Sequence, residues 1–213
     1  MRMRQTQFIL SLMATLAMAT FVQASTIVEV EPNNTLLTAQ SVDSAFSLDF
    51  SDYIGDDMGN NTSLTLPHAT VLSTGDGSFD YFSFTVPADN TTTYFDIDFA
   101  TDAAGGPLDL ELFLYTPGGT FITFNDDAPV AFGAAGSTSV RDPFISHTFA
   151  LAGTYVVGVG RFNSIPLFDG IGGSMLKQGD SYELQISVPE PSTIVLASLG
   201  LLLCMAYSSR RLR

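Results

Sequence analysis

Apolar side chains recur at every second residue along the middle of this chain. The pattern is clearest over residues 80–86, 94–99 and 108–114. Its apolar members are Phe82, Phe84 and Val86, then Phe95, Ile97 and Phe99, then Leu108, Leu110, Leu112 and Leu114. Successive side chains of a strand point to opposite sides, so this period predicts strands with one buried face. The intervening residues, among them Asp96, Asp98, Glu111 and Phe113, are then expected on the other face.

Five more segments have the composition of strands: Ala69–Thr74, Thr120–Asn125, Phe144–Leu151, Thr154–Arg161 and Ser181–Ser187. Turn formers such as Pro117-Gly118-Gly119, Ala152-Gly153 and Gly179-Asp180 separate the segments. No helical stripe of convincing length and no internal repeat lies among them. About eight short strands joined by turns predict an all-β fold, an antiparallel β-sandwich or jelly roll, formed by one domain over residues 25–188.

Charge is distributed unevenly along the chain. Five of the eight basic side chains are terminal, whereas all 22 acidic ones lie between Glu29 and Glu190. Residues 25–190 therefore carry three basic and 22 acidic groups, a formal charge of −19. Such a surface repels phosphate, which argues against nucleic acid and leaves cations, neutral sugars and basic partners as ligands. Cys204 is the only cysteine, so the domain has no disulfide and no thiolate zinc site.

Residues 1–24 have the composition of a secretory signal peptide. Arg2 and Arg4 precede an apolar stretch that runs from Phe8 to Val22, and the small residue Ala24 stands at the expected cleavage position. We therefore predict a signal helix and export by the Sec route. The alternative is an anchor helix that is not cleaved.

The C-terminal segment 189–213 combines a proline motif, an apolar stretch and arginines, in that order. Pro189, Glu190 and Pro191 come first, and the chain closes with Arg210, Arg211 and Arg213. The 19 uncharged residues of 191–209 would form a helix of about 28 Å, close to the ~30 Å of a hydrocarbon core. Because arginines stay in the cytoplasm, we predict a transmembrane helix over 192–209 that anchors a precursor with its domain outside the inner membrane.

This end of the chain resembles the PEP-CTERM proteins. In that class an exosortase recognises and removes the tail, in Gram-negative bacteria that make extracellular polysaccharide. The resemblance implies an exosortase-type processing enzyme as partner and only transient membrane attachment. It also implies a mature protein at the cell surface or secreted into the biofilm matrix, associated with extracellular polysaccharide or a matrix protein. The alternative is an ordinary single-span anchor.

Five segments, in this order, are similar to a pre-peptidase C-terminal (PPC) domain: Glu29–Asn34, Gly75–Val86, Asp109–Tyr115, Leu151–Val159 and Ser181–Ile186. That family is a compact β-sandwich found beside secreted peptidases and in bacterial surface proteins, and it includes the collagen-binding modules of clostridial collagenases. The resemblance covers about residues 29–187. Insertions near 45–70 and 126–142 and the lack of an attached peptidase domain depart from the family pattern.

Oxygen ligands gather at the start of the domain. Glu29, Glu31, Asn33 and Asn34 lie within six residues, and an extended chain places the two glutamates on the same side. Ca²⁺ takes six to eight oxygen ligands, so further carboxylates have to come from elsewhere in the fold. The pattern favours a calcium site. The alternative is that these acids are solvated surface groups.

The resemblance suggests where the other ligands lie. In the collagen-binding branch of the PPC family, a Glu-x-Glu-Pro-Asn segment binds calcium together with acids just before an Asp-x-aromatic strand. Asp80 matches one of those positions, while Asp76 lies one residue away from the other, which Gly77 occupies. A second acidic group, Asp126 and Asp127, is interpreted as a turn or, alternatively, as further ligands.

Catalytic motifs are weak in this sequence. His68 and His147 are isolated, without the paired spacing of a zinc protease. Ser146 and His147 are adjacent on a predicted strand and therefore face opposite ways. We expect a non-enzymatic exported protein. One alternative is a carbohydrate- or protein-binding module with several exposed tyrosines on a flat face, and another is a secreted hydrolase with acids converging beside a histidine.

Overall fold

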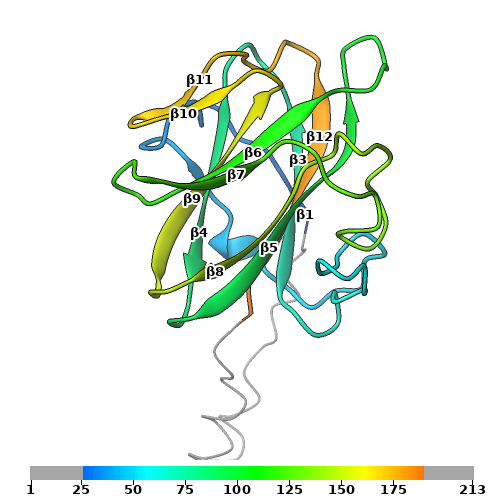
Figure 1. Ribbon diagram of the computed structural model, residues 1–213, viewed down its shortest axis with the longest axis vertical. Helices are drawn as coiled ribbons and strands as arrows, with labels where there is room; N and C mark the ends of the chain where they lie inside the picture. Colours follow the sequence, from blue (N-terminus) through cyan, green and yellow to red (C-terminus); the bar gives the residue numbers. More distant parts are fainter. Residues whose placement is uncertain (1–25, 190–213) are drawn as a thin grey trace, which may run out of the picture.

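The computed structural model describes residues 26–189, which form two five-stranded sheets packed face to face and a separate two-stranded hairpin (Figure 1). The first sheet has the order β1-β3-β12-β5-β8 and the second β2-β4-β9-β6-β7. The elements are β1 (Thr26–Val28), β2 (Gln40–Ser41), the 3₁₀ helix η1 (Asp43–Ala45), β3 (His68–Thr74), β4 (Asp80–Val86), β5 (Thr91–Thr101), β6 (Leu110–Tyr115), β7 (Phe121–Asn125), β8 (Phe144–Phe149), β9 (Gly153–Arg161), β10 (Ile165–Leu167), β11 (Gly170–Gly172) and β12 (Ser181–Ser187).

The all-β sandwich predicted from the alternation is confirmed, with strands at all eight predicted segments. The expected number of strands is too low, because β1, β2, β10 and β11 are only two or three residues long and leave no readable period. Most neighbouring strands are antiparallel, but β1 and β2 pair in parallel with β3 and β4 at the sheet edges. The predicted signal helix and sorting helix lie outside the described residues. Within 26–189, no helix is long and apolar enough to cross a bilayer.

Apolar faces of both sheets form one core. Phe84 of β4 meets the ring of Phe95 of β5 edge-on, with 5.0 Å between the ring centroids, and Leu112 and Leu184 are fully buried in the same cluster. One predicted core residue is displaced. Phe99 has a φ of 53° at a shift of register between β5 and β12, so its ring leaves the core, and Ala100 is buried in its place.

The expectation of strands with one buried face is wrong for β4, β5 and β6, because further chain covers their second faces. Over β4 and β6, the hairpin β10–β11 closes a smaller apolar cluster that contains Tyr81, Phe113 and Ile171. The Tyr115 hydroxyl donates to the carbonyl of Gly170 (2.7 Å), and the backbone N–H of Ile171 donates to the Tyr81 hydroxyl (2.7 Å). Phe113 is therefore fully buried instead of exposed.

Loops 42–67 and 126–143 cover the second face of β5 and lie together at one side of the sandwich (Figure 1). Beneath them Asp96 and Asp98 are buried, contrary to the alternation. Gly133 and Gly136 pass so close that a Cβ at either position would collide with these carboxylates, and both have a positive φ. Ser137 Oγ lies 3.4 Å from Asp96 Oδ1 and 3.5 Å from Asp98 Oδ1.

The two carboxylates share a buried site with no basic partner among the described residues. Burial raises the pKa of Asp98 to about 8, and the charges of Glu183 and Asp142 add to this rise. Burial and the charge of Asp98 raise the pKa of Asp96 well above its ordinary value. The folded state therefore binds protons that the unfolded state has released, and stability decreases as pH rises between about 4 and about 8.

We predict that Asp98→Asn stabilises the protein at pH 8 and has little effect at pH 4.5. Asparagine carries no charge and its carbonyl oxygen still accepts from Gln185 Nε2, which lies 3.2 Å from Asp98 Oδ2. A gain of about 1 kcal/mol would raise Tm by about 2–4 °C in a domain of this size. Thermal unfolding of the full chain across this pH range measures it, with exposed Asp57→Asn as the control. If the difference in Tm between Asp98→Asn and the unsubstituted protein is the same at every pH, the prediction is wrong.

Candidate metal centre

Backbone pairing places the segment after β1 beside the start of β4. The backbone N–H of Glu29 donates to the carbonyl of Leu72 on β3 (3.0 Å), continuing the ladder that β1 forms with that strand. Four residues later, the carbonyl of Asn33 accepts from the N–H of Tyr81 on β4 (3.0 Å). These two contacts stretch the intervening residues across the end of the sandwich. They hold the two glutamates of the segment next to Asp80.

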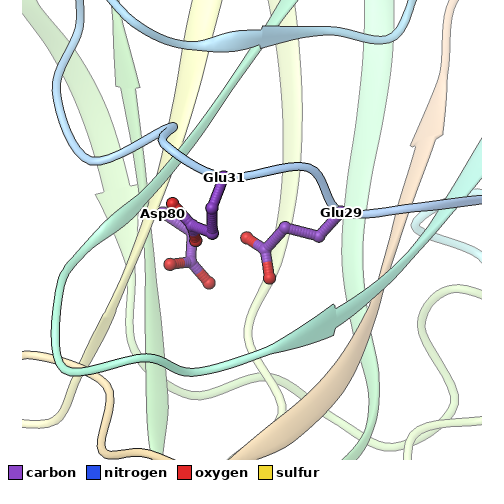
Figure 2. Close-up of side chains that lie close together, drawn as sticks. All are labelled: Glu29, Glu31 and Asp80. Atoms are coloured by element: carbon purple, nitrogen blue, oxygen red, sulfur yellow. The ribbon is translucent and has the colours of Figure 1, made fainter.

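Three carboxylates converge at this point. Glu29, Glu31 and Asp80 each place one oxygen within 4.8 Å of the others, and Figure 2 shows their carboxyl groups turned toward one another. Glu31 is exposed, Glu29 is partly buried and Asp80 has no exposed surface. The centre of a triangle of this size lies within reach of the ~2.3–2.6 Å bonds that Ca²⁺ forms with oxygen.

Two buried oxygens beside the cluster have no hydrogen-bond partner among the described residues. Asp80 Oδ2 accepts from the Tyr182 hydroxyl (2.7 Å), but Asp80 Oδ1 is unpaired. Asn33 donates through Nδ2 to Glu29 Oε1 (2.7 Å), and its Oδ1 is also unpaired. Buried polar atoms are nearly always satisfied, so two unpaired acceptors next to three acids fit a site for a cation.

The hydrogen bonds of the glutamates fix their positions. Glu29 Oε2 accepts from the backbone N–H of Thr74 (3.0 Å), and Glu31 Oε2 accepts from that of Asn33 (2.9 Å). These donors are neutral, and neither ion pair of the described residues involves the cluster. The negative charge of the three acids is therefore uncompensated by the protein.

Electrostatics reflects this crowding. Burial, followed by the charge of Glu29, raises the pKa of Asp80 to about 9. Burial likewise raises the pKa of Glu29. In the absence of a cation, the site binds a proton in order to reduce the repulsion. A bound divalent cation would remove the same repulsion and would accept the orphaned oxygens as ligands.

The structure brings together most of the ligands predicted from the sequence. Glu29, Glu31, Asn33 and Asp80 are adjacent. Asn34 is exposed and its Oδ1 accepts from the N–H of Asn33 (3.0 Å), so it supports the segment from outside. Asp76 is exposed, accepts from Ser78 Oγ (2.6 Å) and lies outside the cluster.

Tyr182 is the contact of the cluster that sequence reasoning missed. It lies on β12, 102 positions from Asp80, and is buried in the apolar core. The sequence around it predicts only that it lies on a strand. The contact with Asp80 depends on how the two sheets pack.

A second group of acids lies at the β7 edge of the second sheet, which also contains β4. Asp109, Asp126 and Asp127 also place oxygens within 4.8 Å of one another. Here a basic group is present, because Arg141 Nε lies 3.8 Å from Asp109 Oδ2. Asp126 and Asp127 follow β7 and are partly or fully exposed. This group therefore offers a weaker case for a metal than the buried one around Asp80.

The two histidines lie apart from both acidic groups. His68 is fully buried and its Nδ1 lies 3.3 Å from the carbonyl of Leu66. His147 packs edge-on against Phe149, with 4.6 Å between the ring centroids. Within residues 26–189, no carboxylate hydrogen-bonds either imidazole, and burial lowers the pKa of both.

Comparison with known proteins identifies one segment of the chain. Residues 187–211 match the PEP-CTERM protein-sorting motif. The chain therefore carries a motif that implies an exported protein, passed across a membrane and processed by an exosortase. The match begins at Ser187, the last residue of β12. A search of curated proteins gives no match.

Among solved structures, the chain is similar to a cycloisomaltooligosaccharide glucanotransferase from Paenibacillus sp. in complex with cycloisomaltoheptaose. The alignment has 12% sequence identity and a TM-score of 0.30, and it covers 76% of this chain. It spans 24% of the glucanotransferase. A likeness of this size supports no argument about fold or activity.

We predict that Asp80→Asn stabilises the protein when a chelator is present. Because the pKa of Asp80 is raised to about 9, the native carboxyl has to hold a proton at pH 7 that the unfolded chain has released. Asparagine avoids this cost, and its carbonyl still accepts from Tyr182. The gain in unfolding free energy at pH 7 is expected to be about 1 kcal/mol or more. Urea denaturation of the full chain in EDTA measures it, with Asp76→Asn as a matched control outside the cluster. If Asp80→Asn lowers the free energy of unfolding and Asp76→Asn does not, the Asp80 carboxyl does not destabilise the native state.

Proposed function

We propose that this is a non-enzymatic exported protein that acts in the extracellular polymer matrix after exosortase processing. The match of residues 187–211 to the sorting motif carries this proposal. The structure of the preceding residues supports it, because Val188 is still buried in the core and donates its N–H to the carbonyl of Pro67 (3.0 Å). Cleavage beyond this residue removes no strand of the sandwich.

The proposed route has three steps. Residues 1–24 direct export by the Sec route and are removed. The apolar segment 192–209 then holds the precursor in the inner membrane, with Arg210, Arg211 and Arg213 on the cytoplasmic side. The exosortase finally recognises the motif that begins at Pro189 and releases the domain to the cell surface or medium.

The buried carboxylate cluster is proposed to bind Ca²⁺. Glu29, Glu31 and Asp80 supply charged oxygens, Asn33 Oδ1 supplies a neutral one, and water completes the shell. The set contains only oxygen donors, which suits a hard cation and not zinc or copper. The ion would tie the segment after β1 to β4 and Tyr182, so its role is structural.

We further propose that the sandwich is a PPC-type domain with two insertions. The ordered segments of that resemblance coincide with β4, β6, β9 and β12 and with the acidic segment after β1. The two departures from the family pattern coincide with loops 42–67 and 126–143, which cover the second face of β5.

The alternatives have less support. Tyr53 is the only tyrosine among the exposed large apolar residues described, so a flat tyrosine face for sugar or protein binding is not favoured. For a hydrolase, acids were expected to converge beside a histidine in a closed pocket. No carboxylate hydrogen-bonds His68 or His147 among residues 26–189, although the charge of Asp49 acts on His68.

We predict that the surface-located protein lacks the residues beyond about Pro191. Replacing Pro189, Glu190 and Pro191 by alanine is expected to leave the full C-terminus attached and the protein in the inner membrane. Intact-mass measurement of cell-surface and membrane fractions from a host with an exosortase tests this, and a strain without the enzyme is the control. Arg213 still present on the surface-located protein would rule out the proposal.

We also predict that calcium stabilises the full chain. With calcium a hundredfold above Kd, the gain is about 2.7 kcal/mol, which corresponds to roughly 5–10 °C in Tm. Glu31→Gln keeps the acceptor for the Asn33 N–H but is expected to remove most of the response, whereas Asp76→Asn keeps all of it. Magnesium should substitute poorly because it requires a tighter octahedron. Equal Tm values in EDTA and in millimolar calcium contradict the calcium site.

A further inference from the structure

The outer face of the first sheet carries two adjoining cavities beside loop 42–67. Their volumes are about 450 and about 380 Å³, within the about 300–1,000 Å³ of small-molecule sites. Leu72 of β3 and Glu183 of β12 line both cavities, and the two residues lie opposite each other in the ladder between these strands. The cavities therefore form one groove, which we call the β3–β12 groove, and share these two side chains.

Aromatic rings border the β3–β12 groove. Phe50 and Tyr53 of loop 42–67 line the first cavity, and Phe99 of β5 lines the second. The φ of 53° at Phe99 turns its ring out of the core, and it meets the ring of Tyr53 edge-on with 5.0 Å between the ring centroids. Phe50 is 65% exposed and Tyr53 is 39% exposed. The rings therefore connect the two cavities and offer apolar surface to a ligand.

Glu183 is a carboxylate without a partner in the described part of the chain. It is half-buried and takes part in neither ion pair of residues 26–189. Burial raises the pKa of its carboxyl, with no hydrogen bond from the described residues to lower it. Its neighbour on β5 is the buried Asp98, which is another acid. Since carboxylates removed from water are normally paired, Glu183 fits contact with a cation that enters the groove.

The charge of the groove selects the sign of its ligand. Asp52 is exposed and lines the first cavity together with Glu183, whereas none of the described residues that line either cavity is basic. The surrounding domain has a formal charge of −19, from three basic and 22 acidic groups. Such a field attracts cations and repels anions. Aromatic rings beside the carboxylates add a further attraction for a positively charged group.

We propose that the β3–β12 groove binds a cationic polysaccharide of amino sugars. The ammonium group of one sugar pairs with the Glu183 carboxylate, its pyranose ring lies against Phe50 and Tyr53, and the next sugar occupies the second cavity. A rigid pyranose suits these rings better than a lysine side chain, which loses more rotamer freedom when it is held. The inference deepens the proposed function, on which it rests for the presence of matrix polysaccharide. With a single tyrosine at its border, the groove differs from a flat tyrosine face.

The test is calorimetric titration of the full chain, in detergent, with a glucosamine tetramer at a slightly acidic pH that keeps the sugar amines protonated. Binding is expected to weaken with added salt, because exposed charges are screened. The N-acetylated tetramer has the same rings without the charges, and it should bind about tenfold more weakly through loss of the charge-assisted contact.

Two substitutions address the two parts of the site. Glu183→Gln is expected to weaken binding of the glucosamine tetramer about tenfold. It removes a charge that acts on Asp98, so no folding defect is expected. Phe50→Ala removes an exposed ring and should weaken binding of both tetramers about fivefold.

Each substitution has a matched control outside the groove. Asp127→Asn removes one acidic charge at an exposed position after β7, and Phe168→Ala removes a ring that is 79% exposed between β10 and β11. Neither should change the affinity by more than about twofold, because neither side chain lines the groove.

Three results would overturn the proposal. Equal binding of the N-acetylated tetramer would show that charge is not recognised, and equal binding of tetralysine would show that the sugar is not. If Glu183→Gln and Asp127→Asn have the same effect, net charge alone explains the binding. A protein that is cut and sorted normally yet binds no glucosamine tetramer refutes this inference and leaves the sorting proposal intact. Binding by a surface-located protein that keeps Arg213 refutes only the sorting proposal.

Discussion

Phe84 lies at the centre of the contact between the two sheets, with its ring 5.0 Å from that of Phe95 and 5.8 Å from that of Phe149. This apolar contact sets the positions of the strand ends where the polar sites are found. Asp80 begins the same strand as Phe84, and Tyr182 reaches it from the opposite sheet (2.7 Å). The carboxylate cluster at Asp80 therefore depends on the packing of the sheets as much as on its own segment.

Scarcity of positive charge governs the electrostatics of the domain. Two loops bury the second face of β5 and with it Asp96 and Asp98, whereas Asp80 is buried between the two sheets beside Tyr182. Residues 26–189 contain only Arg141, Arg161 and Lys177 as basic side chains, and Arg141 and Arg161 are paired with Asp109 and Asp180. Elsewhere, buried carboxylates can be neutralised only by protons, hydrogen bonds or a bound cation.

The sorting motif and the fold meet at one residue. The matched segment begins at Ser187, where β12 ends, and Val188 is the final core contact. Because the final core contact precedes Pro189, the domain can be released from its C-terminal segment without unfolding. This arrangement separates transport from the site on the domain, because the cluster at Asp80 uses no residue of the motif.

The sequence alone determined the eight longer strands, the sorting motif and the acidic segment at Glu29, because alternation, motifs and spacing are local properties. It could not reveal that Asp96 and Phe113 are buried, since their covers come from distant loops and a hairpin. Only the tertiary structure decided that Asp80 joins the cluster while Asp76 stays exposed, and that Tyr182, Arg141 and Arg161 reach their partners. Such contacts depend on how sheets and loops pack, and no local pattern encodes that packing.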